Sequence, residues 1–154
     1  LDMKQEPKFY WDDTTKTATC ILADGNNIFT GIASVHPDDM DMANEKTGYQ
    51  IALWRAEIKY YTHIRDNELK PAFKALKKVM DEMKYSKKFN PKSYENRALQ
   101  RNFYQVESDL DTIRYMLANT KQRLKEYISE KEKFYQKIRA NRTKKDNVGQ
   151  KPSI

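Results

Sequence analysis

The strongest element that the hydrophobic pattern predicts is a long helix with coiled-coil spacing. From about Pro91 to Arg139 the apolar positions recur at alternating steps of four and three residues, and neither Gly nor Pro follows Pro91 within this run. At ~1.5 Å per residue the helix would be roughly 70 Å long, so its apolar stripe has to be buried against a second helix or another subunit. The stripe consists of Leu99, Phe103, Val106, Leu110, Ile113, Leu117, Thr120, Leu124, Tyr127, Lys131, Phe134 and Ile138.

Three antiparallel strands are predicted near the N-terminus. The middle segment alternates, with Ala18, Cys20 and Leu22 on one face. Gly31 in the third segment indicates a bulge or a close backbone approach. The segments are Lys8–Trp11, Lys16–Ala23 and Ile28–Val35, joined by turns at Asp12-Asp13-Thr14 and Asp24-Gly25-Asn26-Asn27.

A helix with apolar residues from Ile51 to Ile64 follows a loop whose Asp and Asn residues can cap it. Trp54 and Ile58 are expected to cover the open face of the sheet, because a lone three-stranded meander is marginally stable. Pro71 removes a backbone donor and clashes with the carbonyl four residues back, so a kink or a break is expected around it.

Residues 69–86 resume the coiled-coil spacing, and the chain reverses near Tyr85 to Lys88. Asn90 is read as the N-cap of the long helix and Pro91 as its first residue. Residues 69–86 and 91–110 should therefore form an antiparallel helical hairpin. This leaves Leu117 to Ile138 without an intrachain partner, which predicts self-association into dimers or higher oligomers through this segment.

The predicted fold class is α+β, in three parts. Residues 8–65 form a β-meander with a covering helix, residues 66–139 form the helical hairpin and long coiled-coil helix, and residues 140–154 form a disordered basic tail.

Composition and charge add a division between the two ends of the chain. Of the 154 residues, 38% are hydrophobic and 33% charged, which suits long helices with solvated faces. The net charge of +7 combines −6 in residues 1–45 with +13 in residues 46–154. The two ends can attract each other between subunits, or the basic part can bind an anionic ligand; a merely solvated, Lys-rich helical surface is the simpler explanation.

The low numbers of cysteine and histidine residues and the lack of long apolar stretches bear on the cellular compartment and on catalysis. One cysteine, Cys20, favours a reducing compartment, and no stretch approaches the ~20 apolar residues that cross a bilayer. We therefore expect a protein of a reducing, cytoplasmic compartment with no membrane association. Two histidines, one cysteine and no glycine-rich phosphate loop or Cys/His metal spacing point to a protein that is not an enzyme and needs no cofactor.

One acidic cluster leaves a metal-dependent nuclease open as a further hypothesis. His36, Asp38, Asp39 and Asp41 are groups that can hold Mg²⁺ for phosphoryl chemistry. The competing interpretation is a loop that caps and neutralises a helix start. Three aspartates close to the helix start also argue against duplex RNA, although the β-β-β-α order of residues 8–65 resembles part of the double-stranded RNA-binding domain. Nucleic acid is therefore not favoured as a partner.

The start of the long helix concentrates groups that suit a nucleotide. Phe89 and Tyr94 offer rings for stacking, and Asn90 offers hydrogen bonds. Arg97 and Arg101 are four residues apart and share one helix face. A helix N-terminus adds free backbone donors, so stacking groups, guanidinium forks and an anion site occur together. A capped hairpin with exposed lysines explains the same residues without a ligand.

Three stretches together resemble the first type of phage Thoeris anti-defence protein. They are Phe9-Tyr10-Trp11-Asp12-Asp13, Gly31-Ile32-Ala33-Ser34-Val35-His36-Pro37-Asp38-Asp39-Met40-Asp41 and Phe89-Asn90-Pro91-Lys92-Ser93-Tyr94. The resemblance implies a non-catalytic sponge that binds a cyclic ADP-ribose-type signal at sites between subunits. It also implies a small antiparallel sheet with long helices.

On that basis the expected function is sequestration of a cyclic adenine-nucleotide immune signal, which would block Thoeris defence. The expected ligand-binding residues are Phe89, Asn90, Arg97 and Arg101, supported by Arg55, Tyr94 and Arg114. The alternative is a phage inhibitor that binds a host protein or nucleic-acid complex through its charged helices, as anti-CRISPR proteins do.

Overall fold

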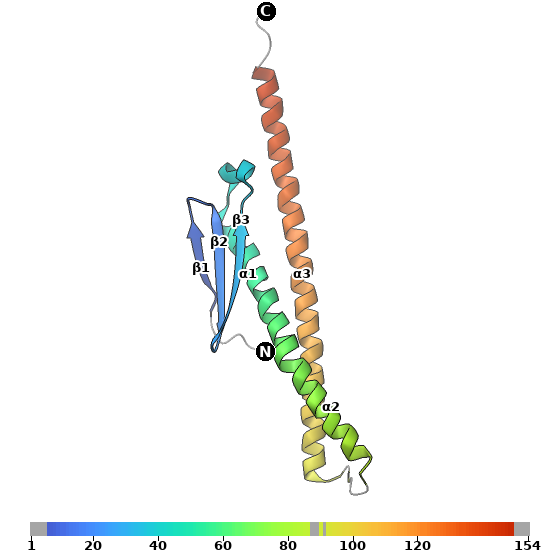
Figure 1. Ribbon diagram of the computed structural model, residues 1–154. Coiled ribbons are helices and arrows are strands. Elements are labelled where there is room, and N and C mark those ends of the chain that lie inside the picture. Colours follow the sequence, from blue (N-terminus) through green and yellow to red (C-terminus); the bar gives the residue numbers. More distant parts are fainter. Residues whose placement is uncertain (1–5, 87–89, 91, 150–154) are drawn as a thin grey trace, which may run out of the picture.

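The computed structural model describes residues 6–86, 90 and 92–149, and it confirms the α+β class. A three-stranded sheet, one helix laid on it and one long helix beyond form successive layers (Figure 1). In chain order the elements are β1 (Lys8–Asp12), β2 (Thr17–Asp24), β3 (Asn27–Ser34), η1 (Pro37–Met42), α1 (Glu45–His63), η2 (Ile64–Leu69), α2 (Lys70–Lys84) and α3 (Tyr94–Gly149).

The sheet is the predicted antiparallel meander, with strand order β1-β2-β3. Ala18, Cys20 and Leu22 are all buried on one face, as their alternation predicts. Gly25 adopts a φ of +58° in the turn between β2 and β3, a conformation that suits glycine. Asp12 holds the first turn, because its Oδ1 accepts hydrogen bonds from the backbone N–H groups of Thr14 and Thr15.

A seam of small residues brings α1 onto the sheet. A Cβ atom on Gly31 would lie 1.9 Å from the carbonyl oxygen of Ala52 and 2.5 Å from the backbone nitrogen of Ala56. The predicted close approach at Gly31 is therefore confirmed, and the approaching element is α1. Farther along α1, the ring of Tyr60 packs edge-on against Phe29, with centroids 5.4 Å apart. Asn44 caps α1 by accepting from the Thr47 N–H at 3.1 Å.

Of the kink or break expected around Pro71, the break is absent, and the helix is irregular just before this residue. The chain stays helical from α1 through α2, and η2 is a π-helical turn in which the N–H of Lys70 bonds to the carbonyl of Arg65. A π turn admits one extra residue and shifts the hydrogen-bond register. Pro71, which has no N–H to donate, then falls in the first turn of α2.

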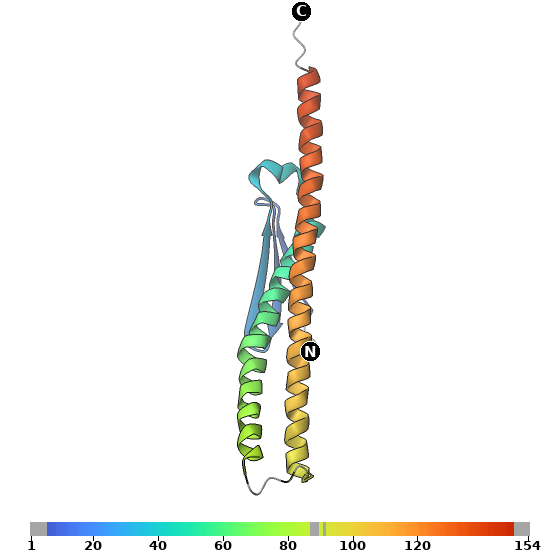
Figure 2. The same cartoon turned by 90° about the vertical axis from the view of Figure 1, so that its right-hand side faces the viewer.

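The predicted helical hairpin is present, but the side chain that caps its second helix comes three residues later than expected. α2 and α3 pack antiparallel, with the rings of Phe73 and Phe103 stacked at 5.1 Å (Figure 2). Ser93, and not Asn90, precedes the first turn of α3: its Oγ accepts from the Asn96 N–H at 3.2 Å. The prediction for Pro91 lies outside the described residues.

The prediction that Leu117 to Ile138 lacks an intrachain partner is wrong. Leu117 and Thr120 are buried in the monomer, and the ring of Tyr127 packs edge-on against Trp54 of α1 at 5.2 Å. Trp54 thus faces α3 and not the sheet, and Ile58 packs against a core that includes Ile113 and Leu117 of α3 as well as strand residues. The helix α1 is therefore a middle layer, covered by the sheet on one side and by α3 on the other (Figures 1 and 2).

The far end of α3 also differs from expectation. Residues 140–149 belong to this 56-residue helix, where the sequence predicted a disordered tail. Along residues 6–86, 90 and 92–149, no helix combines the length and apolar character needed to cross a bilayer.

Candidate functional site: a cleft between η1, α1 and α3

A cleft of about 440 Å³ opens where the end of β3, η1 and the first turns of α1 face α3. Its volume lies within the range of small-molecule sites, roughly 300–1,000 Å³. Four segments far apart in the sequence supply its walls. Its described lining residues are Trp11, Lys16, Ala33, Ser34, Val35, His36, Asp39, Asn44, Thr47, Gly48, Ile51, Arg55, Ile128, Lys131, Glu132, Tyr135, Gln136 and Arg139.

Four cationic side chains line this cleft, against two carboxylates. Arg55 donates from Nη1 to the carbonyl oxygen of Ile32 at 2.6 Å. The ammonium of Lys131 lies 5.3 Å from the centroid of the Tyr127 ring, a cation–π contact. The remaining two cations are Lys16 and Arg139, and the carboxylates are Asp39 and Glu132. Lys16 is paired with Asp13 and Arg139 with Asp39, so the positive charge open to an anionic ligand is carried by Arg55 and Lys131.

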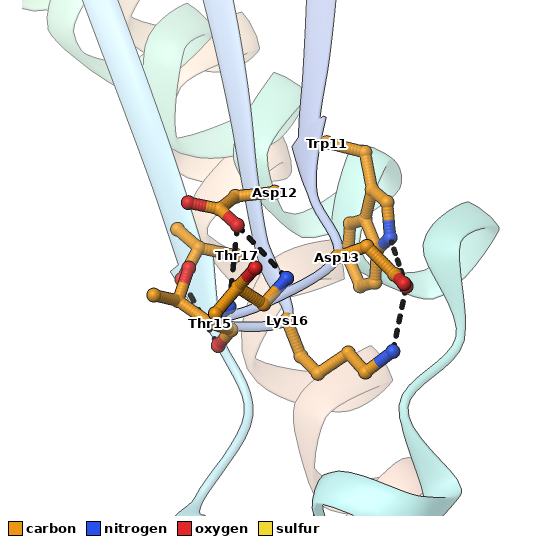
Figure 3. Close-up of polar contacts among 7 residues, drawn as sticks. Trp11, Asp12, Asp13, Thr15, Lys16 and Thr17 are labelled. Carbon is orange, nitrogen blue, oxygen red and sulfur yellow. Dashed lines mark hydrogen bonds and ion pairs between the residues drawn. The ribbon is translucent and has the colours of Figure 1, made fainter.

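Two aromatic rings line the cleft from opposite walls. Trp11, on β1, is held by Asp13, which accepts from Trp11 Nε1 at 3.4 Å and from Lys16 Nζ at 2.6 Å (Figure 3). Tyr135, on α3, is half-buried, and burial raises the pKa of its hydroxyl. A neutral phenol and an indole are good stacking surfaces for a flat heteroaromatic ring.

A double ion pair fastens η1 to α3 and so forms one wall. The side chain of Asp39 is 5% exposed and accepts two hydrogen bonds from the guanidinium of Arg139. This pair lowers the pKa of Asp39 below its ordinary value. Beyond it, Asp41 pairs with Arg142 at 2.6 Å. The acidic and basic ends of the sequence therefore meet within one chain.

The same contacts remove the observation behind the nuclease hypothesis. Asp39 and Asp41 are paired with arginines, and the Nδ1 of His36 accepts from the backbone N–H of Asp38 at 3.2 Å, which caps η1. In the described part of the chain, no group of three or more His, Cys, Asp and Glu side chains could hold a metal ion. Capping and helix docking account for this acidic loop.

The residues predicted at the start of α3 lie far along the molecule from this cleft. Asn90 is engaged in the turn, because its Oδ1 accepts from the Lys92 N–H at 3.0 Å. Arg97 and Arg101 are exposed on α3, as expected for residues that share a face. The prediction for Phe89 lies outside the described residues, as does the side chain of Tyr94.

Two hollows lie near this reversal among the described residues: one of about 20 Å³ between α2 and α3, and one of about 540 Å³ along α2 that includes Phe73 and Tyr85. Arg114 is exposed farther along α3 and lies 3.9 Å from Asp111. Of the seven predicted ligand-binding residues, Arg55 lines the cleft. The structure thus brings Arg97 and Arg101 together with the reversal, and it separates Arg55 and Arg114 from them.

Two features of the sequence point to the cleft. Lys131 interrupts the apolar stripe of α3, and the structure places that interruption at the cleft wall. The charge division was a second signal, because it pairs the loop of Asp39 with the end of α3 at Arg139. Trp11 and Tyr135 carried no such signal.

No protein family, no curated protein and no solved structure matches this chain at a significant level.

Proposed function

We propose that this protein binds and sequesters an anionic adenine nucleotide, of the cyclic ADP-ribose type, without cleaving it. The observation that carries the proposal is the cleft, in which four cations and two aromatic rings surround about 440 Å³. The resemblance to phage Thoeris anti-defence proteins supports the choice of ligand, and sequestration of a signalling nucleotide would block that defence.

The aromatic and the cationic residues of the cleft suit different parts of the nucleotide. An adenine ring can stack on Trp11 or Tyr135, which face the cleft from the sheet and from α3. A pyrophosphate suits the guanidinium of Arg55 and the ammonium of Lys131, since a guanidinium matches phosphate oxygens with two parallel hydrogen bonds. The ammonium of Lys131 has a cation–π contact that a phosphate can replace, whereas Arg55 keeps its bond to the Ile32 carbonyl through Nη1 and offers its other N–H groups to a phosphate.

Binding without turnover is supported by how the titratable groups are used. The imidazole of His36 caps η1, and the carboxylate of Asp39 is bound by Arg139. Neither group is left in the paired acid–base arrangement that hydrolysis of a glycosidic or phosphate bond uses. A sponge needs affinity alone.

Isothermal titration with cyclic ADP-ribose isomers tests the proposal, and two charge reversals locate the site. The variant Lys131→Glu alters the cleft, and Arg101→Glu makes the same kind of change at the start of α3. We expect saturable heat at micromolar ligand for the parent chain, at least tenfold weaker binding for Lys131→Glu, and unchanged binding for Arg101→Glu.

Each contrary outcome has a distinct meaning. Loss of binding in Arg101→Glu alone would move the site to the reversal and contradict the cleft. Recovery of a cleaved nucleotide after heat denaturation would identify a hydrolase. Absence of heat from every nucleotide, together with salt-dependent binding to RNA, DNA or a Cas complex, would favour the inhibitor alternative.

A further inference from the structure

The two free edges of the sheet are treated differently by the rest of the chain. At β3, Arg55 donates to the carbonyl of Ile32 and Lys59 donates to the carbonyl of Thr30, each at 2.6 Å. These cations, one helical turn apart on α1, occupy acceptors that another strand would need. Capping of this kind protects an edge strand from pairing with a second chain.

The edge at β1 has no comparable protection among the described residues. The carbonyls of Thr30 and Ile32 point away from β2. Because the backbone groups of successive residues in an antiparallel sheet point alternately to the two sides of each strand, this fixes which backbone groups of β1 are free. Thr30 pairs with Ile21 and Ile21 with Lys8, so the backbone groups of Lys8 point toward β2. The outward N–H and carbonyl groups of β1 therefore belong to Phe9 and Trp11. No described side chain hydrogen-bonds to them.

The open face of the sheet is almost free of charge, and its two charges lie on β1. Along all three strands, Lys8 and Asp12 are the charged residues on the face turned away from α1, one on each side of Tyr10. Tyr10, Ile28 and Ile32 on this face are more than half exposed. Figure 1 shows β1 on the side of the sheet away from α3, so a second chain can approach it.

We infer that β1 pairs with β1 of a second copy of this chain, antiparallel and centred on Tyr10. This register places Lys8 of each copy opposite Asp12 of the other, so both charges are matched by the symmetry. The outward groups of Phe9 meet those of Trp11 in the second copy and form the ladder hydrogen bonds. The product is a continuous six-stranded sheet with both α1 helices on one face.

This dimer goes beyond the proposed ligand binding and uses a different surface from the self-association expected through Leu117 to Ile138, a segment in which Leu117 and Thr120 are buried within the chain. Because Trp11 lines the cleft, each cleft lies beside the new interface, and Phe9 of one copy neighbours Trp11 of the other.

Sedimentation and disulfide trapping test the register. Lys8→Asp places two carboxylates opposite each other at both ends of the paired strands and should raise the dimer dissociation constant by about tenfold. Tyr10→Cys should form an intermolecular disulfide under mild oxidation, since directly opposed residues that are not hydrogen-bonded have Cα atoms ~4.5 Å apart. Ile32→Cys, equally exposed on the same face but on the capped strand, is the matched control and should not cross-link.

The native Cys20 can stay in all these variants because it is fully buried. A dimer of this kind should be detectable at a protein concentration on the order of 100 µM. A protein that is still monomeric at this concentration would overturn the inference. A dimer that Lys8→Asp leaves intact, or that cross-links through Ile32→Cys and not Tyr10→Cys, would overturn it too. An unchanged far-ultraviolet circular dichroism spectrum and unfolding temperature for Lys8→Asp would separate loss of the interface from loss of the fold.

Discussion

Substitution of Gly31 by alanine tests the layer packing most sharply. The added Cβ atom would lie 1.9 Å from the Ala52 carbonyl oxygen, and contacts under 3.0 Å essentially never occur. The backbone of α1 must therefore retreat by about 1.1 Å, the difference between these two distances. Both contacted atoms are backbone, so no side-chain rotation relieves the clash.

The retreat opens a gap along the whole seam between α1 and the sheet, where Ala18, Cys20, Ala52 and Ala56 are fully buried. A gap of 0.5–1 Å forfeits roughly a quarter to a half of the dispersion energy of each contact. Overpacking of cores costs about 1–3 kcal/mol, and a backbone clash belongs at the upper end. For a chain of this length, about 3 kcal/mol lowers the unfolding temperature by roughly 6–12 °C.

Thermal unfolding followed by circular dichroism measures this shift, with two glycine controls. Gly25→Ala meets no atom within 4 Å but keeps a φ of +58°, so it should cost only about 1 kcal/mol of backbone strain. Gly48→Ala meets the Cβ of Ala18 at 2.9 Å, and the gain in helix propensity of about 1 kcal/mol opposes that contact. An unfolding temperature for Gly31→Ala within 2 °C of the parent would refute the close crossing of α1.

Three further predictions concern ionisable groups. Arg139→Ala should release η1 from α3 and lower the protection of the η1 amides from hydrogen exchange at pH 7, and unchanged protection at pH 7 would contradict the clamp. In the parent chain, because Arg139 lowers the pKa of Asp39, the same release should occur only as pH falls below the ordinary carboxyl value of 3.8. Burial raises the pKa of Glu57 despite the nearby Arg123, so the ionised carboxylate destabilises the folded state as pH rises. Glu57→Gln should therefore raise the unfolding temperature more at pH 7 than at pH 4. Equal increases at the two pH values would contradict this. Burial raises the pKa of Cys20 to about 11 from 9.0, so at pH 8 its reaction with a disulfide reagent should be at least about 100-fold slower in the folded protein than in urea, and comparable rates would show that the thiol is accessible.

The sheet and the helical hairpin were predictable because their signals are local. Alternation in β2 and the turn residue Gly25 fix two strands and their register without knowledge of the remaining chain. The a/d spacing of Phe73 and Phe103 likewise encodes a hairpin that a short reversal can close. These patterns depend on neighbours in sequence and survive any tertiary arrangement.

The position of α3 beside α1 was not predictable from the same signals. The apolar stripe that contains Leu117 and Tyr127 indicates that α3 packs against another element, but it does not identify that element. The sheet-facing residues of α1 are alanines, which carry no bulk, so Trp54 was assigned to the sheet when it faces α3. Only the structure shows which of two apolar surfaces meets the small-residue face.

The cleft is a consequence of that arrangement, and for this reason sequence reading located one of its residues. Arg55 was selected because the family resemblance implies arginines that hold a pyrophosphate, whereas Lys131 and Arg139 come from a helix whose neighbours were unknown. Trp11 reaches the cleft through the register of β1, which the sequence left open. Sites built from segments far apart in the chain require the topology before their residues can be grouped.

The central claim is that the cleft binds the nucleotide, and the fluorescence of Trp11 tests it most directly. The chain holds two tryptophans, and Trp54 contacts Tyr127 away from the cleft lining. The variant Trp54→Phe therefore leaves Trp11 as the single indole reporter. Titration with a cyclic ADP-ribose isomer is predicted to quench this fluorescence saturably, at the same midpoint as the heat of binding. Heat of binding with unchanged Trp11 fluorescence would place the ligand elsewhere and contradict the account.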